Sequence, residues 1–327
     1  MPARRVLVTG GSGFIGTHLV EAVLDDGADL LNVDVQKPPL CNQRQHWCDL
    51  DLRDAKGIER TVAGYRPNVI FNLAAVADSR PAGDALLPNT QGLRNLAVAS
   101  ATLSSPPRLL HVSTQLVVKA GHAPKSVRDY APYTEYGKSK AASEEILWNE
   151  APDLDWTVLR PTNVWGPRHA TFPASTWKYL NRRWYPLPSG LDPVRSYGYV
   201  TNVVGQMIAA SKAEPAEVNR RIFYVGDEPI PSSRWLDGFS LALTGHKARR
   251  VPDGVLKLLA LGGEAVHRMG GSAPLDLGRL YRMTTDYPVP MEETFETLGR
   301  GSVSLDQGIE ETVAWLRREL PDEYQQK

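Results

Sequence analysis

The stretch Arg5-Val-Leu-Val-Thr-Gly-Gly-Ser-Gly-Phe-Ile-Gly16 decides the expected fold. Its apolar beginning is typical of a buried strand, and apolar periodicity predicts a helix from Gly16 to Asp25. The glycines at positions 10, 13 and 16 therefore lie in a turn between a strand and a helix. Such a turn lets the backbone approach a pyrophosphate, and the N–H groups of the helix N-terminus favour its charge. The stretch predicts a nucleotide-binding unit.

Strand-like and helical segments alternate through the first half of the chain. Further strands are expected at residues 30–34, 68–73, 108–112 and 156–159, with helical stretches such as Asn89 to Ala101 between them. This alternation predicts an α/β fold with a doubly wound parallel sheet of the Rossmann type. Ligands of such sheets bind at the carboxyl ends of the strands.

Asp34 ends the second expected strand, where a carboxylate accepts hydrogen bonds from an adenosine ribose. The same carboxylate would repel a ribose 2′-phosphate. No arginine follows in Val35-Gln-Lys-Pro38, although Lys37 is close. The sequence therefore favours NAD over NADP as the cofactor.

Tyr136 and Lys140 lie one turn apart on an expected helix. A neighbouring ammonium favours the ionised phenol, whose ordinary pKa is about 10, so Tyr136 is the predicted general acid/base. Lys140 would lower the pKa of Tyr136. Thr114, or alternatively Ser113, would orient the reacting oxygen by a hydrogen bond. Alternatively, Tyr136 and Lys140 are a solvent-exposed helix pair without a chemical role, and Ser113 and Thr114 reflect only the ordinary composition of a strand.

Composition argues against several other classes of function. Lysine plus arginine and aspartate plus glutamate number 37 each, so no net charge attracts nucleic acid or membrane. The longest apolar run, near Val255 to Leu261, is shorter than the roughly 20 residues of a membrane span, and an apolar strand begins too early for a signal peptide. Cys41, Cys48 and the seven histidines show no metal-ligand or disulfide pattern. We expect a cytoplasmic protein without metal, nucleic acid or membrane partner.

Together, these motifs make the chain resemble the extended short-chain dehydrogenase/reductase family, specifically its NAD-dependent nucleotide-sugar epimerase/dehydratase branch. The resemblance covers most of the chain. It rests on the spaced glycines and on Trp47–Leu50, Asn72–Ala75, Asn89–Asn95, Val112–Thr114, Tyr136–Lys140, Leu159–Pro167, Arg195–Val200 and Ser302–Ile309. It implies an NAD-binding Rossmann domain of residues 1–167 plus about 197–213. Residues 168–196 and 214–327 would form a smaller C-terminal substrate-binding lobe, and helices 89–101 and 136–147 would pair in a homodimer.

The resemblance also implies roles for single residues. The catalytic residues would be Thr114, Tyr136 and Lys140. Residues implied to bind NAD are Gly10, Gly13, Phe14, Ile15, Gly16, Asp34, Asp49, Leu50, Leu73, Ala74, Ala75, Asn89, Val112, Tyr136, Lys140 and Pro161. Residues implied to bind the substrate are Ser113, Gln115, Asn163 and Arg195, the last through a diphosphate.

Gln115 and Leu116 narrow the expected reaction, because the family's 4,6-dehydratases carry Asp-Glu in their place. Neither side chain ionises, so dehydration lacks its acid and base. We expect epimerisation of a nucleotide-diphosphate sugar at C4 through a keto intermediate. A NAD(P)-dependent ketoreductase or dehydrogenase of a sugar, steroid-like or other secondary alcohol, and a non-catalytic NAD-sensing regulator, are alternatives.

The aromatic residues of segment 171–193 would stack on a base or sugar, or pack as a lid or dimer contact. Segment 262–271 is predicted to be helical in its middle, with no chemistry assigned to it.

Overall fold

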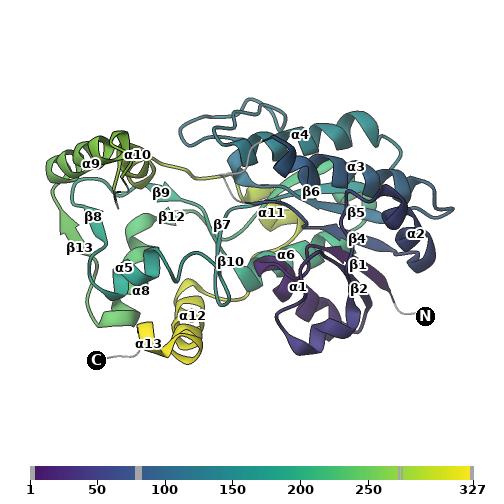
Figure 1. Ribbon diagram of the computed structural model, residues 1–327, viewed down its shortest axis with the longest axis horizontal. Helices are drawn as coiled ribbons and strands as arrows, with labels where there is room; N and C mark the ends of the chain where they lie inside the picture. The colour runs from purple at the N-terminus through teal and green to yellow at the C-terminus, as the bar shows by residue number, and fades with distance from the viewer. Residues whose placement is uncertain (1–3, 78–82, 272, 274, 325–327) are drawn as a thin grey trace. The chain divides into compact units, whose positions relative to one another are not determined.

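The computed structural model describes residues 4–77, 83–271, 273 and 275–324. The chain forms two units, which are described separately (Figure 1). Unit 1 holds the chain up to Val164 together with Val200–Asp227 and Pro290–Gly301. Unit 2 holds Trp165–Tyr199, Glu228–Val289 and the chain from Ser302 onward.

Within the described part of unit 1, seven strands form one parallel sheet in the order β11-β6-β5-β4-β1-β2-β3. Their bounds are β1 (Arg5–Thr9), β2 (Asp29–Val33), β3 (Trp47–Cys48), β4 (Val69–Asn72), β5 (Arg108–Val112), β6 (Trp156–Pro161) and β11 (Arg221–Val225). The central strands are apolar along their length rather than alternating, because helices cover both faces of the sheet. This arrangement confirms the predicted doubly wound Rossmann-type sheet.

The helices of unit 1 fall into two layers (Figure 1). Helices α1 and α6 pack on one face through residues such as Val23 and Met207. Helices α2, α3 and α4 pack on the other face through residues such as Leu96 and Leu147. The helical bounds are α1 (Phe14–Asp25), α2 (Ala55–Tyr65), α3 (Leu87–Ala101), α4 (Glu135–Glu150), α6 (Val200–Lys212), α7 (Pro215–Val218) and α11 (Glu292–Thr297), with short 3₁₀ turns η1 (Cys41–His46), η2 (Gly83–Leu86) and η3 (Gln115–Val117).

Unit 2 is built around aromatic side chains. Trp165, Trp177, Trp235 and Phe239 are buried in one cluster with short ring-to-ring distances. The elements are α5 (Thr176–Asn181), β8 (Pro186–Pro188), β9 (Val194–Arg195), β10 (Tyr197–Tyr199), β12 (Ile230–Pro231), α8 (Ser232–Thr244), β13 (Arg249–Val251), α9 (Asp253–Arg268), α10 (Leu277–Thr284), α12 (Leu305–Glu319) and α13 (Pro321–Tyr324), while β7 (Asn163–Trp165) begins in unit 1. None of the helices that the structure describes is long and apolar enough to span a bilayer.

The division of the chain differs from the expected one at two places. The smaller lobe was expected to hold all of residues 214–327, yet β11 pairs in parallel with β6 and so belongs to the large sheet. Residues 290–301 also join unit 1, where α11 packs against β11 and Arg221 forms an ion pair with Glu293. The chain returns to unit 1 twice, at residues 200–227 and again at residues 290–301. The strand-like pattern of residues 221–225 in the sequence does not show which sheet that strand joins.

Segment 171–193, with its two alternative roles, and segment 262–271, with no assigned chemistry, are both in unit 2. Trp177 of segment 171–193 is fully buried and packs on Phe239, which is a structural role. Trp184 of the same segment is exposed, with the guanidinium of Arg182 over its ring. Segment 262–271 forms the end of α9 and the turn that follows it.

Candidate active site

The glycine-rich turn joins β1 to α1 in unit 1. Gly10 has a φ of +73°, and a Cβ there would lie 2.6 Å from the amide nitrogen of Ala74. A Cβ on Gly16 would collide with the carbonyl oxygen of Gly10, whereas Gly13 has room around it. Helix α1 begins after Gly13 without a side-chain cap and without an acidic residue in its first turn, which includes Phe14 and Ile15. The turn therefore combines close backbone packing with a helix N-terminus suited to an anion.

Asp34 follows β2 and is tied to this turn. Its carboxylate oxygens accept hydrogen bonds from the amide nitrogens of Ser12, at 2.9 Å, and Gln36, at 2.8 Å. Asn32 holds the same turn by accepting from the Gly11 amide at 3.0 Å. Each carboxylate oxygen of Asp34 keeps a further lone pair for a ribose hydroxyl. Lys37 is exposed.

The other residues predicted to bind NAD lie at the ends of neighbouring strands. Asp49 and Leu50 directly follow β3, whose Cys48 accepts a hydrogen bond from the Asp34 amide. Leu73, Ala74 and Ala75 follow β4, Val112 ends β5 and Pro161 ends β6. Because these strands are parallel, their carboxyl ends share one edge of the sheet with the glycine-rich turn.

Asn89 on α3 connects two parts of the candidate site. Its amide group exchanges hydrogen bonds with the backbone of Val76, at 2.7 and 3.2 Å. Its Nδ2 also donates to Ser139 Oγ at 2.9 Å, and Ser139 donates to the carbonyl oxygen of Tyr136. Asn89 therefore fixes the segment after β4 relative to the helix that carries Tyr136.

Tyr136 and Lys140 lie on α4, which Thr134 caps by accepting from the Gly137 amide. Gly137 allows close packing, because a Cβ there would lie 2.5 Å from the Leu116 carbonyl oxygen. This contact joins the start of α4 to η3, whose N-cap is Thr114. Burial raises the pKa of Tyr136 to about 12. The expected lowering by Lys140 is therefore not found, since desolvation of the phenol dominates.

Lys140 is fully buried, and burial lowers its pKa to about 7 although Glu144 acts in the opposite direction. Its Nζ lies 3.4 Å from Nε2 of His111, a residue that the sequence motifs did not single out. Burial, and to a smaller degree the charge of Lys140, lowers the pKa of His111 well below its ordinary value. His111 is therefore neutral at physiological pH.

A buried hydrogen-bond chain fixes the tautomer of His111. Thr9 donates to Oδ1 of Asn72 at 2.7 Å, so the Nδ2 of Asn72 is the donor to Nδ1 of His111 at 3.1 Å. Ser143 donates to the Lys140 carbonyl oxygen, so its Oγ accepts from Nε2 of His111 at 2.8 Å. The proton of His111 consequently lies on Nε2. The chain links β1, immediately before the glycine-rich turn, to the helix of Tyr136.

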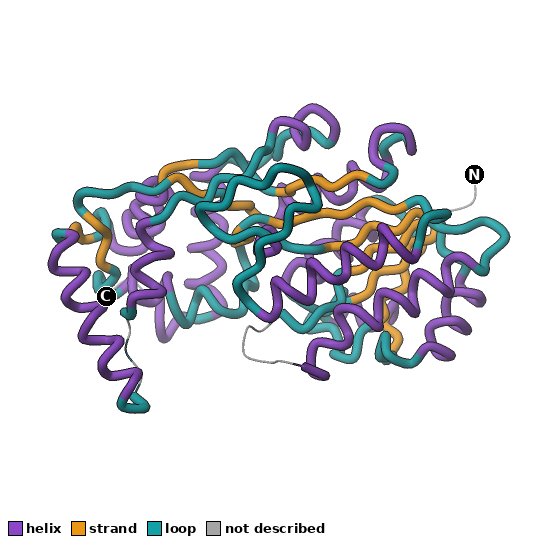
Figure 2. The backbone as a smooth tube through the Cα atoms, turned by 90° about the horizontal axis from the view of Figure 1, so that it is seen from above, coloured by secondary structure: helices purple, strands orange, loops and turns teal. Residues whose placement is uncertain are grey.

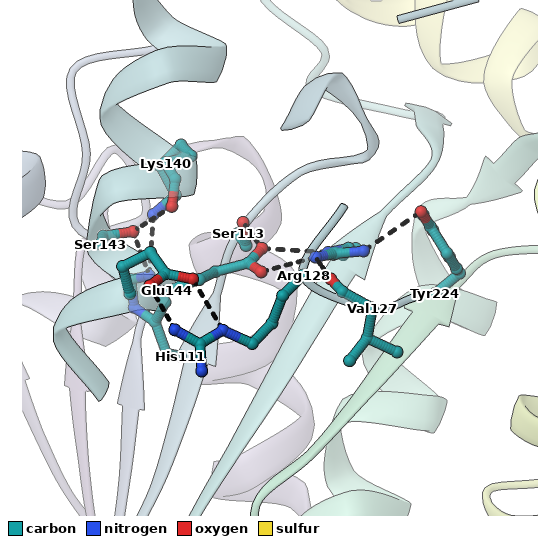
Figure 3. Close-up of polar contacts among 10 residues, drawn as sticks. His111, Ser113, Val127, Arg128, Lys140, Ser143, Glu144 and Tyr224 are labelled. Atoms are coloured by element: carbon teal, nitrogen blue, oxygen red, sulfur yellow. Dashed lines mark hydrogen bonds and ion pairs between the residues drawn. The ribbon is translucent and has the colours of Figure 1, made fainter. Parts of the chain in front are cut away.

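Ser113 and Thr114 have different surroundings. Ser113 donates its hydroxyl proton to Oε1 of the buried Glu144 at 2.5 Å (Figure 3). Glu144 is paired in turn with the buried Arg160, with a shortest distance of 2.6 Å. Ser113 therefore has no proton left for a substrate oxygen. Thr114 only accepts a hydrogen bond, from the Leu116 amide at 3.2 Å, and keeps its proton for donation.

The remaining predicted substrate residues are Gln115, Asn163 and Arg195. Gln115 is buried within η3, next to Thr114, and Asn163 begins β7 after β6. Arg195 belongs to unit 2, where its guanidinium donates to the carbonyl oxygen of Arg282 and lies over the ring of Tyr287. These contacts fix Arg195 within its own unit.

Comparisons with known proteins identify the family and the fold. A family model described as the NAD dependent epimerase/dehydratase family matches residues 6–226. The chain is 27% identical over 208 residues to an N-acetyl-α-D-glucosaminyl-diphospho-ditrans,octacis-undecaprenol 4-epimerase of Escherichia coli O157:H7, a match that spans 61% of this chain and only 60% of that relative. The UDP-glucose 4-epimerase of Thermus thermophilus, solved with NAD, is 25% identical, with a TM-score of 0.70 over 96% of this chain and 99% of that one. The UDP-glucose 4-epimerase of Thermotoga maritima has the same fold, with 24% identity and a TM-score of 0.74 over 97% of this chain and 99% of that one.

Proposed function

We propose a reaction for this chain on the premise that it belongs to the NAD-dependent epimerase/dehydratase family. The proposed reaction is epimerisation at C4 of a nucleotide-diphosphate sugar through a keto intermediate. The observation that carries it is the packing of α4, which holds Tyr136 and Lys140, against η3, which Thr114 caps and which begins with the non-ionisable Gln115 and Leu116. This set supplies one proton-transfer group and no separate acid and base for eliminating water.

The residues around the glycine-rich turn fit NAD. Gly10 and Gly16 pack so closely that no side chain fits, the N-terminus of α1 lacks a competing acidic side chain, and Asp34 retains acceptor capacity for ribose hydroxyls. When bound, NAD supplies a reversible hydride acceptor. The turn and Asp34 would hold the adenosine diphosphate half, and Lys140 would hold the nicotinamide ribose.

Tyr136 is the proposed proton carrier. It would take the proton of the C4 hydroxyl during oxidation and return it after the keto sugar has presented its other face. Thr114 would donate a hydrogen bond to the reacting oxygen, a role for which Ser113 is unsuited because it donates to Glu144. Lys140, in its charged form, would stabilise the phenolate of Tyr136 and offset the pKa increase caused by burial.

A second candidate substrate would undergo the same epimerisation but carry a lipid instead of a nucleoside on its diphosphate. The E. coli O157:H7 relative is named for a sugar joined through a diphosphate to undecaprenol. The exposed leucines of α9 favour this lipid-linked class as the alternative to a nucleotide sugar. In either class Arg195 is the proposed partner of the diphosphate. A homodimer through α3 and α4 and a cytoplasmic location remain predictions.

The test uses the purified chain with NAD and a panel of UDP- and dTDP-hexoses, together with a polyprenyl-diphosphate N-acetylglucosamine. Nuclear magnetic resonance identifies the product, and absorbance at 340 nm follows NADH. We expect the C4 epimer to form without net accumulation of NADH. Stoichiometric NADH formation would favour the dehydrogenase alternative. NAD binding without any turnover across the panel would favour the regulatory alternative.

A further inference from the structure

Unit 2 exposes an apolar surface on α9 that no described part of the chain covers. Leu258 and Leu259 are 71% and 55% exposed, and Met269, just after the helix, is 80% exposed. Val255 and Leu261 are exposed as well. At 3.6 residues per turn, these positions share one broad side of the helix. We call this set (Val255, Leu258, Leu259, Leu261 and Met269) the α9 apolar face.

This face is not the one that α9 uses for folding. Leu256, Ala260 and Gly263 are buried and lie on the opposite side, toward α10 and β8. Gly263 is part of this packing, because a Cβ there would collide with the carbonyl oxygen of Leu275. The helix is therefore apolar on two sides, and the inner side alone accounts for its place in unit 2.

Helices α9 and α10 form a hairpin that projects from the rest of unit 2 (Figures 1 and 2). Leu277, at the start of α10, adds another exposed apolar side chain. A projecting hairpin presents the α9 apolar face to a surface larger than a small ligand.

The segment that contains β13 and the hairpin carries an excess of basic side chains, part of it on β13, although the chain has equal numbers of basic and acidic residues. Between Lys247 and Tyr287 there are seven lysine and arginine residues and four acidic ones. Lys257 and Arg268 are exposed on α9 along the edge of the apolar face that holds Leu261, and Arg268 also forms a 3.9 Å ion pair with Glu264. The carboxylates of Asp253 and Asp276 accept hydrogen bonds from backbone amides, which engages them within the fold.

We propose that the α9 apolar face, with its flanking cations, docks unit 2 onto an anionic lipid surface. Leucines with lysine and arginine beside them suit the boundary between acyl chains and negative headgroups. A protein partner would favour aromatic anchors, and the α9 apolar face holds none, although Tyr281 of α10 is exposed; leucine is also under-represented among the residues that dominate protein interfaces. Helix α9 has 16 residues, so it would lie along the surface rather than cross the bilayer.

This inference stands apart from the proposed reaction, and it bears on the substrate class. The expectation of no membrane partner came from the net charge of the whole chain, which conceals the local excess of cations. A docked unit 2 is compatible with a sugar diphosphate carried by a lipid. A nucleotide sugar would need no such surface.

The test is co-sedimentation of the full chain with vesicles of phosphatidylcholine, with and without an equimolar share of phosphatidylglycerol. We expect binding to the anionic vesicles, weakened by salt and by Lys257→Glu with Arg268→Glu. Leu258→Ser with Leu259→Ser should lower partitioning at least about tenfold. The matched control is Leu191→Ser with Leu241→Ser, at positions 49% and 44% exposed in the same unit, which should bind like the wild type.

Three results would overturn the proposal. The first is that the wild type does not bind anionic vesicles. The second is that the Leu258/Leu259 variant binds them as the wild type does. The third is that light scattering shows an oligomer formed through α9, which this variant dissociates. NAD binding by each variant verifies folding. Turnover on a soluble nucleotide sugar reports on the proposed reaction separately, so failure of docking and failure of the reaction are distinguishable.

Discussion

Nζ of Lys140 lies 3.4 Å from Nε2 of His111, and both side chains are fully buried in unit 1 (Figure 3). The hydrogen-bond chain from Thr9 through Asn72 fixes His111 as a neutral ring. A second positive charge at this place would repel Lys140. Because His111 is neutral, Lys140, one helical turn from Tyr136, is the side chain of this pair that can carry a positive charge.

The first prediction concerns the pH dependence of stability. The pKa of His111 is far below its ordinary value of 6.5 in the folded chain, so below pH 6.5 the unfolded chain binds a proton that the folded chain does not. His111 therefore costs stability as pH falls, by up to about 1.4 kcal/mol per pH unit. Urea unfolding between pH 5 and 7.5 should show a shallower loss for His111→Gln than for the wild type.

The control for this experiment is His246→Gln, at an exposed histidine of unit 2. It should follow the wild-type pH dependence. Equal slopes for His111→Gln and the wild type would contradict the assignment of His111 as a buried neutral ring.

The second prediction separates the neighbouring hydroxyls. Ser113→Ala should lower the free energy of unfolding by about 1–3 kcal/mol, because Glu144 loses a buried hydrogen bond. Thr114→Ala should cost about 0.5–2 kcal/mol of stability, because Thr114 caps η3, and should lower kcat about 100-fold, since it removes a donor to the reacting oxygen. Thr114→Ser should restore most of the rate. Chemical denaturation and steady-state kinetics give the two readouts, and a larger kcat loss in Ser113→Ala would reverse the assignment.

The third prediction isolates the close packing of the glycine-rich turn. Gly10 and Gly27 have nearly the same φ, +73° and +75°, but only at Gly10 would an added Cβ meet other atoms within 4 Å. Each change to alanine should cost about 1–2 kcal/mol for the left-handed backbone. Gly10→Ala should additionally abolish NAD binding, measured by calorimetry, because Ala74 must move. Equal NAD affinities in the two variants would place the cofactor elsewhere.

The fourth prediction compares a buried and an exposed ion pair. Glu144→Gln leaves Arg160 without its buried counter-charge and should cost about 3–5 kcal/mol in urea unfolding. Burial alone would lower the pKa of Arg160, but Glu144 raises that pKa above its ordinary value. Glu150→Gln breaks the exposed pair with Arg94 and should cost no more than about 1 kcal/mol. Similar losses for both variants would mean that Glu144 does not hold β5, β6 and α4 together through its buried contacts.

Sequence reasoning was most successful where a motif dictates local geometry. The glycine spacing, the strand alternation and the position of Asp34 after β2 all follow from period and turn chemistry, and they predicted the Rossmann-type sheet. His111 was missed because a histidine inside an apolar strand looks like ordinary strand composition. Its role depends on Asn72 and Ser143, which lie 39 and 32 residues away in the chain.

Other parts depend on long-range packing that no local pattern encodes. The partnership of Ser113 with Glu144 separates it from Thr114, and only the fold brings that carboxylate to β5. The predicted effect of Lys140 on Tyr136 considered charge alone, whereas burial raises the pKa of the phenol. The return of residues 290–301 to unit 1 likewise depends on contacts with β11.

The most direct test of the proposed epimerisation is an isotope measurement with a nucleotide sugar deuterated at C4. If Tyr136 exchanges only the hydroxyl proton and the C4 hydrogen returns to the same carbon, the product retains deuterium at C4 with inverted configuration, and Tyr136→Phe gives no product while still binding NAD. Deuterium lost to solvent, or recovered in accumulated reduced cofactor, would contradict that account.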